Sequence, residues 1–399
     1  MDWSCLIRNK ESLCVSTDTR NLPAGCVFFA LHGATFDGNT FAAQALEQGA
    51  SVAVIDNPDY AIEGKTILVP DTLLALQELA REWRRTLNIP IIAITGTNGK
   101  TTTKELTAAV LATRYKVHYT QGNLNNQIGV PLTLLQLTRA HEIAIIEMGA
   151  SHPGDIKELV EIAEPTCGLI TNVGRAHLQG FGSFEGVMST KAELYDYLRQ
   201  HGGFIFRNTD NPYLAQMAGE LQTIAYTTGI MPEQSHLVGA YNAENISAAI
   251  CVGGYFGVSE NDALTAVCAY EPSNKRSQRL QTARNIIIVD AYNANPTSMQ
   301  AAINAFKGDT YILGEMRELG EYSHLEHQNI VNMLLERKAD KVLLVGKEYK
   351  ATTAPYPIYD DVQALCAALQ AQPIQAAHIL LKGSRGNKLE ELLPYLKVI

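Results

Sequence analysis

Several features are absent from this sequence, and each absence excludes a class of protein. The seven cysteines are scattered and form no C-x-x-C pair, so we expect buried free thiols in a reducing cytoplasm. The chain has no long basic run and a net charge of −9, which argues against a nucleic-acid partner. Neither an apolar signal core in "MDWSCLIRNK" nor an apolar run of membrane-span length is present. We therefore expect a cytoplasmic protein without stable membrane insertion.

Length and composition predict a globular protein of several domains. A chain of 399 residues, of which 46% are hydrophobic and 18% charged, is long enough for two or three cores. Residues 1–88 contain short apolar pieces between turns and close with a helical run at 71–87. This pattern predicts a small N-terminal α/β domain over 1–88.

From residue 89 onward, buried strands alternate with amphipathic helices. The strand candidates are 91–95, 142–149, 167–174 and 203–208, and the helix candidates are 103–114, 155–163 and 189–200. Such alternation is typical of a parallel sheet with right-handed crossovers. It predicts a central domain over 89–278.

A second alternation starts near residue 285, after an expected linker at 271–283. Its strand candidates are 285–292, 310–316, 341–347 and 378–384, and its helix candidates are 297–307, 324–338, 362–370 and 388–396. The pattern predicts a small doubly wound C-terminal domain over 279–399.

The segment "GTNGKTT" at 96–102 stands between a predicted strand and a predicted helix. A standard phosphate loop, G-x-x-x-x-G-K-[ST], would have its first glycine at position 94, which is Ile94. The context nevertheless favours phosphate binding over a plain strand-to-helix turn, because backbone N–H groups and a helix N-terminus converge there. Lys100 is placed to reach the β- and γ-phosphates, and Thr101 to bind Mg²⁺. The expected nucleotide-binding residues of the loop are Gly96, Thr97, Asn98, Gly99, Lys100, Thr101 and Thr102.

Three more side chains near predicted strand ends or helix starts suggest metal chemistry. Glu147 ends a buried strand, where open α/β sheets bind ligands, although a salt bridge to a core cation would also explain it. His177 follows the next strand end, and a lone histidine is more often a satisfied structural residue. Lys191 lies near a helix start, which disfavours a cation. A carbamylated Lys191 would be an anion and a possible metal ligand, whereas the ordinary interpretation is a solvated surface lysine.

Taken together, these stretches resemble the Mur ligases, the ATP-dependent amide ligases of peptidoglycan assembly, over nearly the whole chain. "GTNGKTT" is shared with all Mur ligases and with folylpolyglutamate synthases. The segments "GNLNNQIGVPLTLL", "DAYNANPTSM", "GEMRELGEYSHLEH" and "LLKGSRGNKLEELL" are similar to the MurF-type, D-alanyl-D-alanine-adding branch. The resemblance implies a monomeric three-domain α/β ligase, with a central P-loop-type parallel sheet between a UDP-sugar-binding N-terminal domain and a Rossmann-like C-terminal domain. It also implies that D-alanyl-D-alanine is added to UDP-N-acetylmuramoyl-tripeptide through an acyl phosphate.

The resemblance assigns roles to matched positions. Lys100 would hold the phosphates, Thr101 and Glu147 one Mg²⁺, and His177 with a carbamylated Lys191 a second Mg²⁺. The remaining ATP contacts would be Asn242 and Asn245 at adenine, Arg276 near the γ-phosphate and Asp290 at the ribose. The substrate-binding residues would be Thr17, Asp18 and Arg20 at the uridine nucleotide and Asn123, Asn125 and Asn126 along the sugar-peptide channel.

Two departures from the family pattern and two alternatives accompany this interpretation. Tyr241 stands where the family usually has His, and the short segment 229–236 replaces a run of antiparallel strands, so we expect an abbreviated central domain. Another amino-acid-adding Mur ligase or a folylpolyglutamate synthase is the nearest alternative. An NTPase switch or motor would instead require the full phosphate loop.

Overall fold

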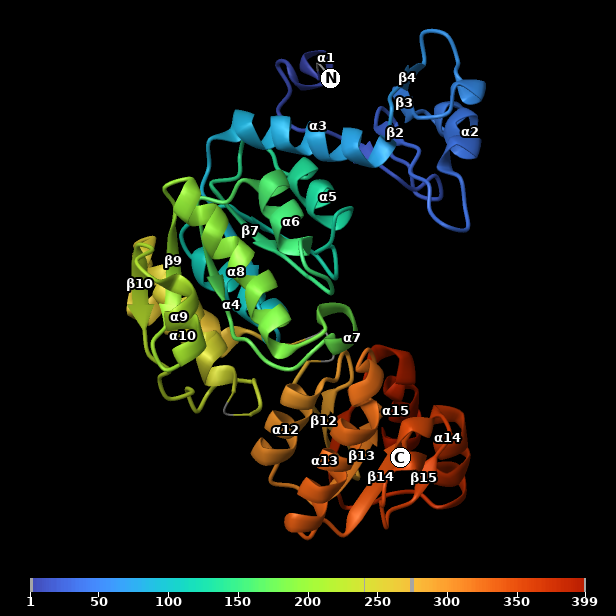
Figure 1. Cartoon of the computed structure of the whole chain (residues 1–399), viewed down its shortest axis with the longest axis vertical. Coiled ribbons are helices and arrows are strands. Elements are labelled where there is room, and N and C mark those ends of the chain that lie inside the picture. The colour runs from blue at the N-terminus through green and yellow to red at the C-terminus, as the bar shows by residue number, and fades with distance from the viewer. Residues whose placement is uncertain (1–2, 240, 273–275, 398–399) are drawn as a thin grey trace.

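The computed structural model describes residues 3–239, 241–272 and 276–397, and it contains three β-sheets. Figure 1 shows the three α/β units in succession: the N-terminal unit in blue, the central one mainly in green and yellow, and the C-terminal one in orange and red. The predicted α/β class, with a central parallel sheet between two further α/β units, is confirmed. No helix in the described part of the chain is long and apolar enough to span a bilayer.

The N-terminal sheet has four parallel strands in the order β1-β2-β3-β4. Its elements are α1 (Ser4–Ile7), β1 (Val15–Ser16), β2 (Val27–Phe29), the 3-10 helix η1 (Gly38–Phe41), α2 (Ala42–Glu47), β3 (Val52–Ile55), the 3-10 helix η2 (Pro58–Tyr60) and β4 (Thr66–Leu68). The apolar pieces read from the sequence form β2 and β3, whereas the short β1 and β4 were not predicted.

Helix α3 (Thr72–Leu87) links the N-terminal and central units, as the horizontal helix in the upper part of Figure 1. Its N-cap is Asp71, whose side chain accepts a hydrogen bond from the Leu74 N–H at 2.8 Å, and its C-cap is Asn88 in the left-handed conformation. Trp83 is fully buried and donates from Nε1 to the carbonyl of Leu137 at 3.0 Å. The last turns of this helix therefore pack into the central unit.

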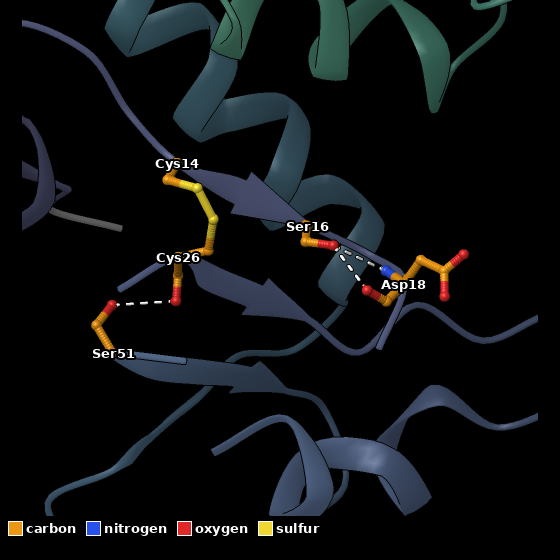
Figure 2. Close-up of a disulfide and its surroundings, with 5 residues drawn as sticks. All are labelled: Cys14, Ser16, Asp18, Cys26 and Ser51. Atoms are coloured by element: carbon orange, nitrogen blue, oxygen red, sulfur yellow. Dashed lines mark hydrogen bonds between the residues drawn. A yellow bond between two sulfur atoms is a disulfide. The ribbon is translucent and has the colours of Figure 1, made fainter. Parts of the chain in front are cut away.

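The expectation of free thiols is wrong for Cys14 and Cys26, which are joined by a disulfide with a Cα–Cα distance of 4.5 Å (Figure 2). The two residues immediately precede β1 and β2, and the parallel register pairs Val15 with Val27. Adjacent strands thus place the cysteines side by side, a relation that twelve residues of sequence separation conceal. Of the free cysteines, Cys167 and Cys366 are buried as expected, but Cys5 is exposed.

The central sheet has six parallel strands in the order β10-β9-β8-β5-β7-β6. The strands are β5 (Ile91–Thr95), β6 (Val117–Tyr119), β7 (Ile143–Glu147), β8 (Cys167–Ile170), β9 (Phe204–Asn208) and β10 (Thr223–Tyr226). The helices are α4 (Lys100–Leu111), α5 (Gly129–Leu135), α6 (Asp155–Ala163), α7 (Leu178–Phe181), α8 (Phe184–Gln200), α9 (Pro212–Ala218), α10 (Asn242–Tyr255) and α11 (Glu260–Ala269). Every residue of β5, β7 and β8 is buried, which explains their continuous apolar runs.

The four predicted central strands and three predicted helices are confirmed: β5 and α6 have their predicted bounds, and the other elements have shifted ends. Helix α4 starts three residues before its predicted start and α8 five residues before, and β8 ends at Ile170. The sequence did not predict strands β6 and β10 or helices α5, α7, α9, α10 and α11. Between Tyr226 and Asn242 the described residues form no helix or strand, in agreement with the abbreviated segment 229–236.

The C-terminal sheet has the order β11-β12-β16-β13-β14-β15, and only β11 pairs antiparallel among its strands. The strands are β11 (Gln278–Gln281), β12 (Ile286–Asp290), β13 (Thr310–Gly314), β14 (Lys341–Val345), β15 (Ile358–Tyr359) and β16 (His378–Lys382). The helices are α12 (Pro296–Ala305), α13 (Ser323–Glu336), α14 (Val362–Ala371) and α15 (Leu393–Lys397), with the 3-10 helices η3 (Gly320–Tyr322), η4 (Lys347–Ala351), η5 (Arg385–Asn387) and η6 (Leu389–Leu392).

Two expectations about this unit are wrong. The expected linker 271–283 contains β11, whose sequence "QRLQ" has no apolar run because it is an edge strand. The expected helix 388–396 is a 3-10 turn, η6, followed by the short α15. The domain limits 1–88, 89–278 and 279–399 stay predictions; β11 begins at Gln278, one residue before the predicted start of the C-terminal domain.

Candidate active site

One cavity of about 730 Å³ lies at the carboxyl ends of the central strands, and residues of the C-terminal unit line its other side. Strand β5 lies between β7 and β8, so the winding of the sheet reverses around it. Ligands of open α/β sheets bind at such a reversal. The cavity is lined by 97–102, by loop residues around Asn125, by Glu147, by the start of α10 and by Asp290, Tyr292 and Asn293.

Two glycines with positive φ shape the loop between β5 and α4. Gly96 has a φ of +138° and Gly99 a φ of +81°, which L-residues rarely adopt. A Cβ on Gly96 would lie 2.0 Å from Thr171 Oγ1, and one on Gly99 would lie 2.4 Å from Asn245 Oδ1. The loop therefore fits its surroundings only with glycine at both positions, and it directs the N-terminus of α4 at the cavity.

Lys100 is partly exposed to the cavity and bends back over its own loop. Its Nζ donates to the carbonyls of Gly96 at 2.8 Å and Thr97 at 3.1 Å. Desolvation lowers the pKa of Lys100 to about 8; Glu147 acts to raise it and Arg276 to lower it. The amine is thus held next to the place where phosphates would meet the loop.

Glu147 ends β7 with only 1% of its surface exposed. Its Oε1 accepts hydrogen bonds from the Asn125 side-chain amide at 2.8 Å and the Thr101 hydroxyl at 3.2 Å. Its Oε2 has no hydrogen bond within the described residues and lies 3.7 Å from the Nζ of buried Lys104. The salt bridge to a core cation is therefore present, and it coexists with an oxygen left free of hydrogen bonds.

His177 lies at the start of α7 in the left-handed conformation, with a φ of 50°. Its Nδ1 contacts the carboxylate of Glu318, a C-terminal residue that also has a positive φ, 62°. Burial lowers the pKa of His177, with further lowering from Lys100 and Lys191, while Glu318 opposes the shift. Both His177 and Glu318 line the cavity.

Lys191 is buried in α8, 2% exposed, and is not a solvated surface lysine. Its Nζ lies 5.6 Å from the centre of the Phe181 ring, and no hydrogen bond or ion pair reaches this amine within the described residues. Burial lowers its pKa well below the ordinary value, and Lys100 lowers it further, against Asp155 and Glu193. Lys191 does not itself line the cavity.

The first turn of α10 presents two buried amides to the cavity. The Asn245 side chain donates to Asn242 Oδ1 at 2.8 Å, and Asn242 donates to the carbonyl of Val238 at 2.8 Å. Tyr241, the departure from the family pattern, shares a hydrogen bond of 2.6 Å with Ser277 Oγ. The Tyr241 hydroxyl is thus hydrogen-bonded to the residue that precedes β11, and the Asn242 and Asn245 side chains still line the cavity.

The C-terminal side of the cavity carries cations next to Asp290. Lys382 Nζ donates to Asp290 Oδ2 at 2.7 Å, across adjacent strands β16 and β12. The guanidinium of Arg276 lies 4.0 Å from the centre of the Tyr292 ring, and its buried Nε has no hydrogen-bond partner within the described residues.

A direct contact joins the phosphate loop to the C-terminal unit. Asn295, the N-cap of α12, donates from Nδ2 to Asn98 Oδ1 at 2.8 Å. The backbone N–H of Asn98 is held by Asn172 Oδ1 at 3.0 Å, in the loop after β8. The loop is therefore fixed from both the central and the C-terminal sides.

The sequence matches three family models along its length: "Mur ligase family, catalytic domain" over 13–84, "Mur ligase middle domain" over 94–233, and "Mur ligase, glutamate ligase domain" over 275–385. It is also 36% identical to the UDP-N-acetylmuramoyl-tripeptide–D-alanyl-D-alanine ligase of Bacillus subtilis (strain 168), over 95% of this chain and 92% of the relative. The chain belongs to the Mur ligase family.

Solved structures of the same family are similar to this Mur ligase over almost its full length. MurF from Acinetobacter baumannii is 30% identical with a TM-score of 0.84, covering 96% of this chain and 93% of its own. MurF ligase from Thermotoga maritima in complex with ADP is 26% identical with a TM-score of 0.86, covering 97% of both chains.

The expected substrate residues of this Mur ligase fall into two groups. Asn123, Asn125 and Asn126 line the cavity, and Asn126 also accepts the Gly129 N–H at 2.9 Å at the start of α5. The N-terminal group lies outside the cavity: Asp18 and Arg20 form an exposed ion pair, in which Arg20 lowers the pKa of Asp18 to about 2. Thr17 is likewise not a lining residue.

Several site residues of this Mur ligase were missed by the sequence reasoning. They are Lys104, Asn172, Tyr292, Asn295, Glu318 and Lys382. A strand-end rule would have found Asn172, which follows β8, and Lys382, which ends β16. No local signal marks Lys104, whose partner Glu147 lies far along the chain on another element of the central unit, or Glu318, whose partner His177 lies in a different unit.

Proposed function

We propose that this Mur ligase is a cytoplasmic, monomeric ATP-dependent enzyme that joins D-alanyl-D-alanine to UDP-N-acetylmuramoyl-tripeptide in peptidoglycan precursor synthesis. The observation that carries the proposal is the single cavity in which the phosphate loop, the buried Glu147 carboxylate and Arg276 of the C-terminal side meet. The name of the B. subtilis relative supports the two substrates, and the ADP bound to the T. maritima relative supports ATP.

In the first step, the terminal carboxylate of the tripeptide attacks the γ-phosphorus of ATP and forms an acyl phosphate, with ADP as the leaving group. Two anions must approach each other, so cationic groups at the reaction centre lower the barrier. Lys100 and Arg276 are the candidate catalytic cations, and the N–H groups at the start of α4 would hold the β- and γ-phosphates.

The donor set beside the phosphate loop fits one Mg²⁺. The Thr101 hydroxyl and the Glu147 carboxylate are oxygen ligands, and Glu147 Oε2 lacks a hydrogen bond within the described residues. No cluster of three or more His, Cys, Asp or Glu side chains suited to a metal occurs in the described ranges, so phosphates and waters would complete the shell, as Mg²⁺ prefers. When bound, the ion would offset charge on the phosphates.

We assign the second predicted Mg²⁺ to His177 together with a carbamylated Lys191. An amine adds CO₂ only when it is unprotonated, and the lowered pKa of Lys191 favours that form. A Lys191→Ala variant should lose activity and regain part of it with short carboxylic acids. Activity at the wild-type level without added acid would refute the assignment.

The remaining contacts follow from the resemblance and from the places of the residues. Asn242 and Asn245 would contact adenine and Asp290 the ribose, since all three line the cavity. The asparagines at 123, 125 and 126 would bind the sugar-peptide part. Thr17, Asp18 and Arg20 would bind the uridine nucleotide, a role that requires the substrate to extend from the cavity to the N-terminal sheet.

In the second step, the amine of D-alanyl-D-alanine attacks the acyl carbonyl, and phosphate leaves as the amide bond forms. The acyl phosphate must be protected from water until then. The C-terminal unit already contacts the loop through Asn295 and the His177 segment through Glu318, so its closure over ATP would provide that protection.

The direct test measures phosphate release from ATP in the presence of UDP-N-acetylmuramoyl-tripeptide, with and without D-alanyl-D-alanine. We expect the dipeptide to stimulate release and free amino acids not to. Stimulation by a free amino acid instead of the dipeptide would show that the chain is a different amino-acid-adding ligase.

A further inference from the structure

Lys104 is a buried cation that the proposed reaction does not use. It lies in α4 one turn after Lys100 and has 1% of its surface exposed. Residues three and four positions apart share a helix face, so Lys104 is on the same side of α4 as Lys100 and Thr101. Unlike those two residues it does not line the cavity, and it therefore does not contact a ligand there.

The two oxygens of Glu147 have different environments. Oε1 is occupied, because it accepts hydrogen bonds from both Thr101 and Asn125. Oε2 faces Lys104 Nζ at 3.7 Å, which is beyond hydrogen-bond distance. Lys104 thus supplies positive charge behind the carboxylate without occupying the second oxygen.

The surroundings of Lys104 hold its amine in this place. The Nζ lies 3.8 Å from Glu105 Oε1 and 5.6 Å from the centre of the Tyr119 ring. The Glu105 carboxylate also accepts the hydroxyl hydrogen bond of Tyr270. The amine is therefore restrained between a carboxylate of its own helix and the one that ends β7.

We propose that Lys104 is a positioning residue that holds the Glu147 carboxylate in place from behind, so that Oε2 keeps no hydrogen bond and remains available to Mg²⁺. Without Lys104 the buried carboxylate would lose its nearby compensating charge, whereas a direct hydrogen bond from Lys104 would occupy the free oxygen. The inference rests on the proposed function in one respect, namely that Glu147 is a Mg²⁺ ligand.

The test compares ADP binding with MgCl₂ and with EDTA by calorimetry, because the ratio of the two dissociation constants isolates the metal contribution. For Lys104→Met we expect this ratio to fall at least tenfold, while the affinity in EDTA changes less than twofold. Lys157→Met removes a lysine that is 70% exposed on α6 and is the control with an unchanged ratio.

A second comparison distinguishes a positioning role of Lys104 from a role in fold stability alone. In a Glu147→Gln background, Lys104→Met should not change the Mg²⁺ ratio further, and this pair of variants remains informative if the single Lys104→Met protein does not fold. A Lys104→Met protein that melts earlier but keeps the wild-type ratio would overturn the proposal, as would a wild-type protein whose ADP affinity ignores Mg²⁺. Neither measurement involves D-alanyl-D-alanine, so a wrong acceptor assignment would show only in the phosphate-release test.

Discussion

Two buried lysines each face a carboxylate at the end of a parallel strand, one in the central unit and one in the C-terminal unit. Lys382 and Asp290 form a hydrogen-bonded ion pair at 2.7 Å, and Lys382 also donates to the carbonyl of Asn293 at 3.2 Å. Lys104 and Glu147 stand 3.7 Å apart with no hydrogen bond between them. A lysine and a strand-end carboxylate therefore meet in both units, but in two different arrangements.

The difference separates a carboxylate that is hydrogen-bonded to its lysine from one that keeps an oxygen open to a metal ion. Asp290 has its charge compensated directly, and its lysine fixes the chain at 290–293 next to the cavity. Glu147 has a compensating charge nearby but keeps one oxygen without a hydrogen bond. The spacing of the ion pair, and not its presence, distinguishes the two sites.

The largest expected effect is the difference in kcat between variants of Glu147 and variants of Asp290. Glu147→Gln should lower kcat of ATP-dependent ligation by about 100-fold or more, because it removes a charged oxygen at the centre of charge development. Asp290→Asn should lower kcat by only about tenfold or less, through looser nucleotide placement. Steady-state phosphate release measures both. Equal losses would remove the distinction between the pairs.

The free energy of unfolding, in contrast, should depend on the Lys382–Asp290 pair. Lys382→Met leaves Asp290 without its hydrogen-bonded cation, and we expect the free energy of unfolding to fall by about 2–3 kcal/mol. The double variant Lys382→Met/Asp290→Asn should recover part of that loss. Denaturant unfolding measures the change, with Lys307→Met, at an exposed position, as the control. If the double variant is less stable than the single one, the pair is not an ion-pair unit.

Lys100 offers a third case, because it bonds to carbonyl oxygens and not to a carboxylate. Its pKa is lowered to about 8, so the ligand-free amine is cationic below that pH and neutral above it. The apparent dissociation constant of ADP should therefore rise by up to about tenfold per unit as the pH increases above 8. Lys100→Arg, which stays charged, should bind with little pH dependence over the same range. A flat profile for the wild type would contradict the expectation.

The smallest effect concerns the contact that connects the two units holding these pairs. Asn98→Ala removes the acceptor of Asn295 but leaves the backbone of the loop in place. The loss of one hydrogen bond is worth about 1 kcal/mol, so ADP binding should weaken about fivefold. Asn261→Ala, at an exposed position of α11, is the control that should bind ADP normally. An unchanged Kd for Asn98→Ala would show that the two units do not cooperate through this contact.

Hydrophobic periodicity and the strand-end rule predicted much of the fold. The strand-end rule also predicted Glu147 as a site residue, and the family resemblance predicted Asp290, but neither predicted the two lysines of the compared pairs. The rule placed Thr101, Glu147 and His177 near one another because parallel strands end at one edge of the sheet. It did not predict Lys104, since the partner of a strand-end carboxylate depends on how α4 packs over the sheet.

Other misses have similar causes. The edge strand β11 has no apolar run, so the sequence predicts a linker where the structure has a strand. The Cys14–Cys26 pairing depends on the register of β1 and β2, which spacing alone does not reveal. Contacts made between units, such as Glu318 with His177, have no sequence signature at all.

The disulfide has a consequence for the segment it encloses. Residues 14–26 form a covalent ring that contains Thr17, Asp18 and Arg20, the residues we assign to the uridine nucleotide. In Figure 2 the Ser16–Asp18 turn lies at the end of the strand that follows Cys14, and Ser16 Oγ accepts the Asp18 N–H at 3.1 Å. A segment whose two ends are joined covalently has less conformational entropy to lose when a ligand orders it. Oxidation of the two thiols would thereby make the turn that we assign to the uridine nucleotide more rigid before any ligand binds.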